Sequence, residues 1–128
     1  MRRVWILAGA FAAAGVIFGL VLFLGDWAFD YRRHMLHQGR MERVLEQRPT
    51  VERLTAGLAE EGAFVLAAPS SPHELEQVIA DHGGGRGLEI REKAGRWGHL
   101  TVYRASDMLY FVFFDDERVM RDFTCVGG

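Results

Sequence analysis

The sequence predicts an α+β protein with an N-terminal single transmembrane helix, a helical stalk and a small C-terminal domain. Residues 4–25 form an unbroken apolar run, 26–48 are rich in helix formers, and short apolar stretches alternate with turn residues from 63 onward. We expect an anchor over 1–25, a juxtamembrane stalk over 26–49 and an extramembrane domain over 50–128. The sheet of this domain is expected to be an antiparallel β-meander of about four strands with one or two packing helices.

The apolar run over 4–25 has the length of a membrane span. It holds no charged residue, proline, asparagine or glutamine. A helix rises about 1.5 Å per residue, so the run would extend roughly 33 Å, close to the hydrocarbon thickness of a bilayer. A cleaved signal peptide would have a shorter apolar core, of about 7–15 residues, and a cleavage site between small residues. The run is longer and its exit lacks such a site, so we expect an uncleaved signal-anchor.

The charges that flank the run bear on its orientation. Arg2 and Arg3 precede it, whereas Asp26 and Asp30 follow it before the arginines of the stalk. Basic residues close to a span tend to stay in the cytoplasm. We expect a bacterial inner-membrane protein with its C-terminal domain in the periplasm, although counting the stalk arginines favours the reverse orientation. Cys125 is the only cysteine, so it forms no intrachain disulfide and fits either compartment.

Small residues recur along one side of the expected anchor. Spacings of four, three and four residues place them on one helical stripe, formed by Ala8, Ala12, Gly15 and Gly19. Small residues let membrane helices approach closely, so the stripe predicts packing against transmembrane helices of other subunits or of a second copy. The alternative is that glycine and alanine are simply common in membrane helices. Aromatic side chains mark the expected membrane interfaces at Trp5, Trp27 and Tyr31.

The segment over 26–48 is expected to continue the helix out of the membrane, because it contains no proline before Pro49. Its apolar residues fall near a heptad spacing at Trp27, Tyr31, Met41 and Leu45, with His34 and Gln38 as polar interruptions. A short coiled coil, insertion into a partner's groove and an arginine-rich membrane-skimming helix are all open interpretations.

Two helices are expected in the first half of the domain. The segment Thr50–Glu61 has apolar side chains on one side and is followed by a glycine. Ser71 is the expected N-cap of the second helix, with Pro72 at its first position and Glu74 completing a capping box. This second helix ends at Gly83 and presents one apolar face that can cover a sheet.

Short stretches bounded by turn residues predict strands over 63–67, 88–93, 100–104, 108–114 and 119–126. The stretch over 108–114 is apolar at every position, which is typical of a central strand covered on both sides. We therefore expect Phe111 and Phe113 at the centre of the core.

Residues capable of chemistry are few and scattered. Asp30, His34 and His37 share one side of the expected helix and could offer three metal ligands, but we favour the simpler interpretation of a polar patch at the membrane interface. The glycines over 83–87 follow a helix and so favour a C-cap over a phosphate site. Cys125 has no second cysteine nearby and is expected to be a buried apolar thiol. We expect no catalytic, cofactor-binding or metal-binding residue.

The net charge of −2 and the pI near 6.2 argue against a nucleic-acid binder. The pattern favours a non-catalytic single-pass accessory subunit or assembly factor of a bacterial membrane protein complex, with the lipid bilayer and neighbouring transmembrane helices as its partners. Two alternatives remain open: a membrane-tethered binding module for a soluble partner or ligand, and a small metal-handling enzyme that uses the histidine-bearing helix.

Overall fold

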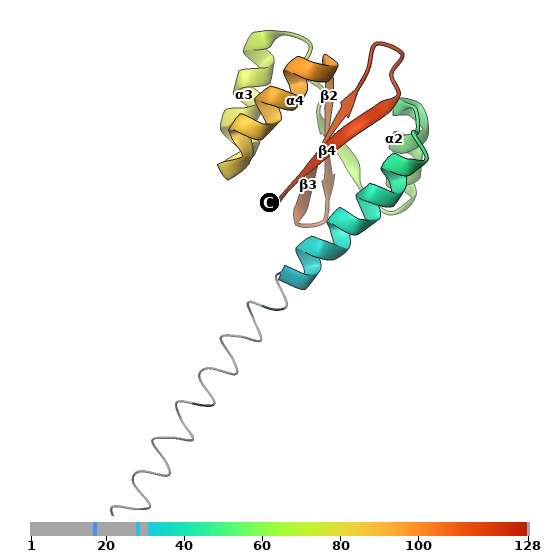
Figure 1. Cartoon of the computed structure of the whole chain (residues 1–128), viewed down its shortest axis with the longest axis vertical. Coiled ribbons are helices and arrows are strands. Elements are labelled where there is room, and N and C mark those ends of the chain that lie inside the picture. Colours follow the sequence, from blue (N-terminus) through green and yellow to red (C-terminus); the bar gives the residue numbers. More distant parts are fainter. Residues whose placement is uncertain (1–16, 18–27, 29–30, 128) are drawn as a thin grey trace, which may run out of the picture. The chain divides into compact units, whose positions relative to one another are not determined.

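The computed structural model describes residues 17, 28 and 31–127, and the chain divides into two compact units, Met1–Met35 and Leu36–Gly128. A leading helix over 31–46 precedes the named elements. These are α2 (Val51–Glu60), β1 (Phe64–Ala67), α3 (Pro72–His82), the 3-10 turn η1 (Gly84–Arg86), α4 (Gly87–Trp97), β2 (His99–Ala105), β3 (Met108–Phe114) and β4 (Met120–Gly127). The second unit is therefore an α+β domain (Figure 1).

The four strands form one antiparallel sheet in the order β1-β2-β3-β4. This meander confirms the strands expected over 63–67, 100–104, 108–114 and 119–126. A tight turn at Ser106 and Asp107 joins β2 to β3, and Ser106 has a φ of 59° there. That value suits a two-residue hairpin, whose first central residue has a positive φ.

The prediction of a strand over 88–93 is wrong, because these residues belong to α4. Alternation of Leu88 and Ile90 with charged residues resembles a strand, but Ile90, Ala94 and Trp97 also recur at helical spacing and pack on one core. Ion pairs at i,i+4 between Lys93 and Glu89 and between Arg96 and Glu92 further favour the helix. Gly98, at a φ of 89°, ends it in the left-handed conformation.

The two helices expected earlier in the domain are confirmed as α2 and α3. The hydroxyl of Thr50 accepts a hydrogen bond from the Arg53 backbone N–H, and that of Ser71 accepts one from the Glu74 backbone N–H. The Glu74 carboxylate, however, accepts from the backbone N–H and the hydroxyl of Ser70, so the return bond of the capping box reaches one residue further back.

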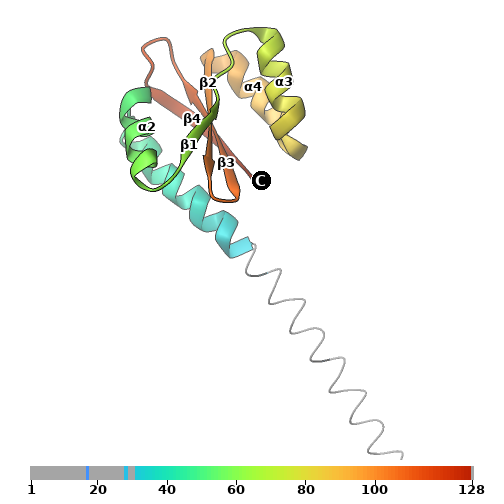
Figure 2. The ribbon, with the colours of Figure 1, turned by 180° about the vertical axis from the view of Figure 1, so that it is seen from behind.

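Helices cover both faces of the sheet, with α2 on one side and α3 and α4 on the other (Figures 1 and 2). On what we call the first face, the sheet packs on α2 and on the leading helix, and its core includes Tyr103, Tyr110 and Cys125. On the second face it packs on α3 and α4 through residues such as Phe111 and Phe113. All seven residues of β3 are buried, which confirms it as the central strand covered on both sides.

The leading helix contributes to the core of the domain. Met41 is fully buried on the first face, and Val44 and Leu45 pack beside it. Residues 36–46, expected from the sequence as part of a stalk, thus lie against the sheet. The apolar run over 4–25, apart from Ile17, lies outside the described residues.

Candidate docking groove at the sheet edge

The sheet has an incompletely paired edge at β1. This strand has only four residues, and its register with β2 runs from Phe64 opposite Arg104 to Ala67 opposite Val102. Within the described part of the chain, the first residues of β2, His99–Thr101, pair with β3 but have no strand on their other side. An unpaired stretch of strand offers free backbone N–H and C=O groups to another chain.

A groove of about 490 Å³ lies beside this unpaired stretch. Its apolar lining comes from both layers of helices and from the segment that leaves β1: Val51, Ala68, Pro69, Pro72, Leu75, Ala94, Leu100 and Phe114. Its polar lining is Ser70, Ser71, His99, Thr101 and Arg118, with Gly98 at the end of α4. An apolar floor with a few polar groups is the usual composition of a binding site.

The wall of the groove that follows β1 is held by Glu74. Its carboxylate oxygen Oε2 accepts hydrogen bonds from the Ser70 backbone N–H at 2.8 Å and from the Ser70 hydroxyl at 3.0 Å. Both bonds lower the pKa of Glu74 below its ordinary value, and the bond from the backbone N–H has the larger effect. The segment over 68–72 is therefore anchored to the first turn of α3.

The opposite wall is held by the β3–β4 hairpin. Oδ1 of Asp115 accepts hydrogen bonds from the backbone N–H groups of Glu117 and Val119, and Oδ2 accepts one from Nε of Arg121 at 2.7 Å. The bond from Arg121 is the main cause of the lowered pKa of Asp115. Arg118, in the middle of this turn, has a φ of 62°, and its carbonyl accepts a bond from the Val51 N–H. The groove is thus framed by groups that are already hydrogen-bonded.

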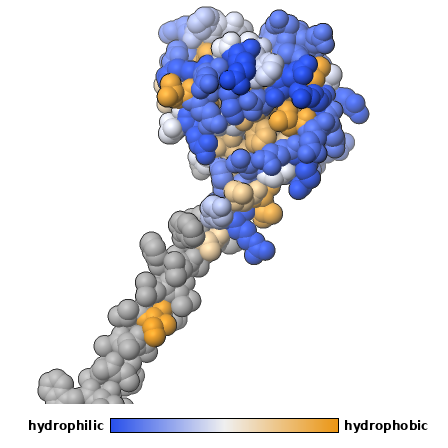
Figure 3. Space-filling model, in the orientation of Figure 1, coloured by the Kyte–Doolittle hydropathy of each residue, from blue (hydrophilic) through white to orange (hydrophobic). Residues whose placement is uncertain are grey.

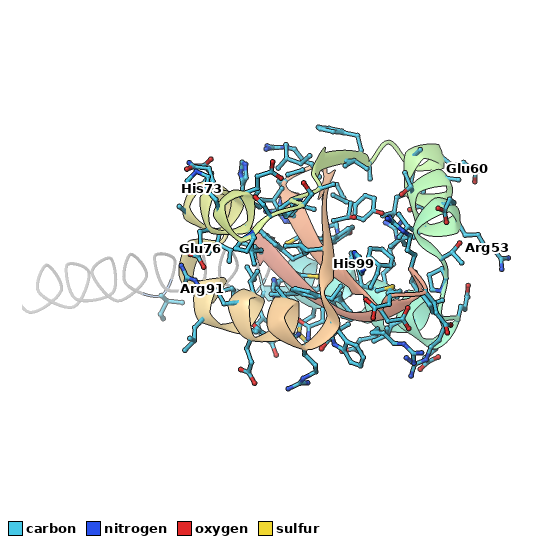
Figure 4. All side chains as sticks on the ribbon, turned by 90° about the horizontal axis from the view of Figure 1, so that it is seen from above. Arg53, Glu60, His73, Glu76, Arg91 and His99 are labelled. Carbon is cyan, nitrogen blue, oxygen red and sulfur yellow. The ribbon has the colours of Figure 1, made fainter. Side chains whose placement is uncertain are left out.

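His99 is the titratable side chain on the unpaired stretch of β2. Its Nε2 lies 3.4 Å from Oδ1 of Asp116, and its side chain is 43% exposed. Figure 4 shows His99 at the start of β2, apart from Glu76 of α3 and Arg91 of α4, which point toward one another. A hydrogen-bonding imidazole in this position suits recognition of a polar group of a bound chain.

At the other edge of the sheet, side chains engage the backbone of β4 at Phe123. Nζ of Lys93, on α4, donates to the carbonyl of Phe123 at 2.8 Å and to Oδ1 of Asp122 at 3.1 Å. Oδ1 of Asp122 in turn accepts from the Phe123 N–H at 2.8 Å. Both backbone groups of Phe123 are therefore engaged by side chains, and a lysine at this position opposes pairing with a further strand.

Most of the site residues predicted from the sequence fall outside the described residues, namely Ala8, Ala12, Gly15, Gly19, Trp5 and Trp27. Tyr31 is described; it is helical and 56% exposed. Asp30 also lies outside, whereas Nδ1 of His37 is hydrogen-bonded to the hydroxyl of the buried Tyr110. In the part of the chain that the structure describes, no three His, Cys, Asp or Glu side chains gather closely enough to hold a metal ion. Nor does any described helix combine the length and apolar character needed to cross a membrane.

The groove was not predicted from the sequence. One sequence feature could have indicated it: the short apolar strand is followed directly by Ala68-Pro69-Ser70-Ser71-Pro72. Prolines turn a chain away from strand pairing, so this feature predicts that the strand ends early. That β2 extends beyond the end of β1 is visible only in the pairing register. No protein-family model, curated protein or solved structure matches this chain.

Proposed function

We propose that this protein is a non-catalytic single-pass accessory subunit or assembly factor of a bacterial membrane protein complex. In this proposal the run over 4–25 anchors the chain in the inner membrane and packs on neighbouring transmembrane helices through Ala8, Ala12, Gly15 and Gly19. The domain, in the periplasm, docks on a neighbouring subunit through the groove beside His99–Thr101.

The observation that carries the proposal is the difference between the two edges of the sheet. The β4 edge has its backbone groups at Phe123 engaged by Lys93 and Asp122. The β1 edge is short, and the unpaired start of β2 borders a groove with apolar walls. Strand addition supplies main-chain hydrogen bonds for affinity and pockets for alternate side chains for specificity. A module that docks needs one open edge and one blocked edge, so that it binds a partner without polymerising.

The test is purification of the full chain from its native membranes in mild detergent, with mass spectrometry of the proteins that accompany it. We expect membrane subunits in stoichiometric amounts. The variant Ala68→Arg places a large charged side chain in the groove and should release them. Ala59→Arg makes the same change at an exposed alanine of α2 that does not line the groove, and should retain them.

The anchor is tested in the same assay. Gly15→Ile with Gly19→Ile should weaken association because bulk separates helix backbones, whereas the same change at the neighbouring positions, Val16→Ile with Phe18→Ile, should matter less. If the two pairs behave alike, the small-residue stripe is not an interface.

The volume of the groove also favours one alternative function, a membrane-tethered binding module, because small-molecule sites commonly occupy about 300–1,000 Å³. Recovery of a soluble partner or a small ligand, released by Ala68→Arg, would support that alternative over the subunit. Recovery of bound metal would support the metal-handling enzyme.

A further inference from the structure

The domain places its exposed large hydrophobic side chains at one end. In the described residues of the second unit these are Leu36 (66% exposed), Phe64 (55%), Val65 (43%) and Leu88 (79%). On the face drawn in Figure 3, the described surface of the domain is mostly hydrophilic, with separate hydrophobic patches. Isolated exposed hydrophobic residues are ordinary, whereas exposed hydrophobic residues gathered on one part of a surface mark contact with a partner or a membrane.

Pairing and packing locate these side chains. Phe64 lies opposite Arg104, next to the β2–β3 turn. Leu88 is in the first turn of α4. Because α4 ends where β2 begins, the start of α4 lies near the other end of β2, at the β2–β3 turn. Figures 1 and 2 agree: the start of β1, the start of α4 and the C-terminal end of β4 lie at one end of the domain, and the β3–β4 hairpin lies at the other.

Leu36 belongs to the same end. Its neighbour His37 is hydrogen-bonded to Tyr110, which is close to the start of β3. Arg40, one turn further along the leading helix, forms an ion pair with Glu61, just before β1. The chain thus enters the domain at the end that carries the exposed hydrophobic residues, and the docking groove, which includes His99 and Arg118, lies at the opposite end.

The length of the connecting chain limits what this end can meet. Ten residues, 26–35, lie between the end of the apolar run and Leu36, and 31–35 already belong to the leading helix. The connection therefore spans roughly 30 Å if 26–30 are extended, and about 16 Å if it is helical throughout. A short tether gives the surface a high effective concentration near whatever holds the run. A contact too weak to form between separate molecules is then populated.

We infer that the end of the domain formed by Leu36, Phe64, Val65 and Leu88 rests on the lipid bilayer, with these side chains in its interfacial region. The inference rests on the membrane anchor of the proposed function. Apolar side chains at a membrane surface bury their area among headgroups and upper acyl chains. Contact at this end directs the groove away from the bilayer, toward the extramembrane part of a partner.

The experiment uses the full chain in phosphatidylcholine vesicles, with a bimane fluorophore on a single introduced cysteine. Phe64→Cys and Leu88→Cys report on the inferred contact, and Glu117→Cys, exposed in the β3–β4 hairpin, is the control at the other end. Cys125 is 4% exposed, so the chain without an introduced cysteine should take up no label and serves as the blank. Alkaline carbonate extraction of the same vesicles establishes whether the chain is integrated.

We expect a headgroup nitroxide lipid to quench the labels at 64 and 88 several-fold more than the label at 117, and aqueous iodide to show the reverse order. Equal iodide quenching at all three positions in an integrated chain would overturn the inference and leave the anchor standing. Protection of 64 and 88 from both quenchers would also overturn it, because protein would then cover this end. Release of the chain by carbonate would instead remove the anchor, and the inference with it.

Discussion

The two faces of the sheet are built on different principles. On the first face buried polar groups have partners: the Tyr103 hydroxyl is 2.8 Å from that of Thr55, and the Tyr110 hydroxyl is bonded to His37. On the second face the core is hydrocarbon, including Phe111, and its outer polar contacts lie at the surface. Within the described residues, the two buried side-chain polar atoms without a hydrogen-bond partner, Nε1 of Trp97 and Oγ1 of Thr124, belong to this second face.

This difference separates two ways of fixing a helix on a sheet. Apolar packing on the second face is non-directional and scales with the area removed from water. Hydrogen bonds on the first face are directional, so they set the position of the leading helix and α2 along the sheet. The face with directional hydrogen bonds is therefore the one on which the leading helix packs. The predictions below use a chain of residues 36–128, in which Trp97 is the only tryptophan and reports unfolding.

The largest effect is expected from the hydrocarbon face. Phe111→Ala removes a fully buried ring from the central strand and should lower the free energy of unfolding by about 3–5 kcal/mol. That loss is comparable to the whole stability of a small domain, so the cooperative transition in denaturant should be largely lost. A loss of less than about 1 kcal/mol would mean that the Phe111 ring is not central to the core of the second face.

Alkaline pH should act on the first face. Burial raises the pKa of the Cys125 thiol from 9.0 to about 11, and burial also raises the pKa values of Tyr103 and Tyr110. Each group is neutral when protonated, and its pKa is higher in the folded than in the unfolded chain. Their contribution to the free energy of unfolding is therefore fully present below pH 9 and declines toward pH 11. For the Cys125 thiol alone this decline is on the order of 2 kcal/mol.

Denaturant melts at several pH values between 7 and 11 measure this loss. Cys125→Ala should flatten the dependence, whatever it costs at neutral pH, because the thiol no longer ionises in the unfolded chain. An unchanged slope in this variant would place the alkaline sensitivity elsewhere.

A smaller loss is expected from Tyr103→Phe, which deletes one hydroxyl on the first face. The ring keeps its packing, but the bond to Thr55 disappears. Unfolding free energy should fall by about 1 kcal/mol, the usual net value of one hydrogen bond. Equilibrium melts of the two chains, compared with Thr55→Val, would reveal whether the two hydroxyls act as a pair.

The same kind of deletion on the second face should have the opposite sign. Thr124→Val replaces a buried hydroxyl that has no partner by a methyl group of nearly the same shape. Stability should be unchanged or rise, by up to about 1 kcal/mol, because an unsatisfied buried hydroxyl is costly. A clear loss in the same melt would contradict the contrast between the faces.

Much of the fold was predictable, because the local signals are strong. The N-caps Thr50 and Ser71 mark the starts of α2 and α3, and the uniformly apolar β3 indicates a strand covered on both sides. The prediction of a strand over 88–93 failed because the pattern of a few apolar residues fits both the strand period of about 2 residues and the helix period of about 3.6 residues. The core contacts of Ala94 and Trp97, beyond the end of the expected strand, decide for a helix there, and the i,i+4 ion pairs of α4 support it.

The candidate site was less predictable. The groove joins residues from α2, the segment after β1, α3, α4, β2 and the β3–β4 hairpin, and no motif links them in sequence. The role of Lys93 depends likewise on a contact with β4 some 30 residues away. The docking proposal therefore depends on the register of the sheet, which a single sequence does not specify at its edges.

By itself the sequence determined the apolar run over 4–25, the helices α2 and α3, the four strands of the meander, and the burial of β3. These follow from composition, capping and periodicity, which act between residues close in the chain. Tertiary structure alone decided that Met41 of the leading helix belongs to the core, that β2 is unpaired at its start whereas the β4 edge is engaged at Phe123, and that the exposed hydrophobic residues share one end. The physical reason is that burial and pairing depend on which distant segments meet, and many arrangements of the same elements satisfy the local preferences equally well.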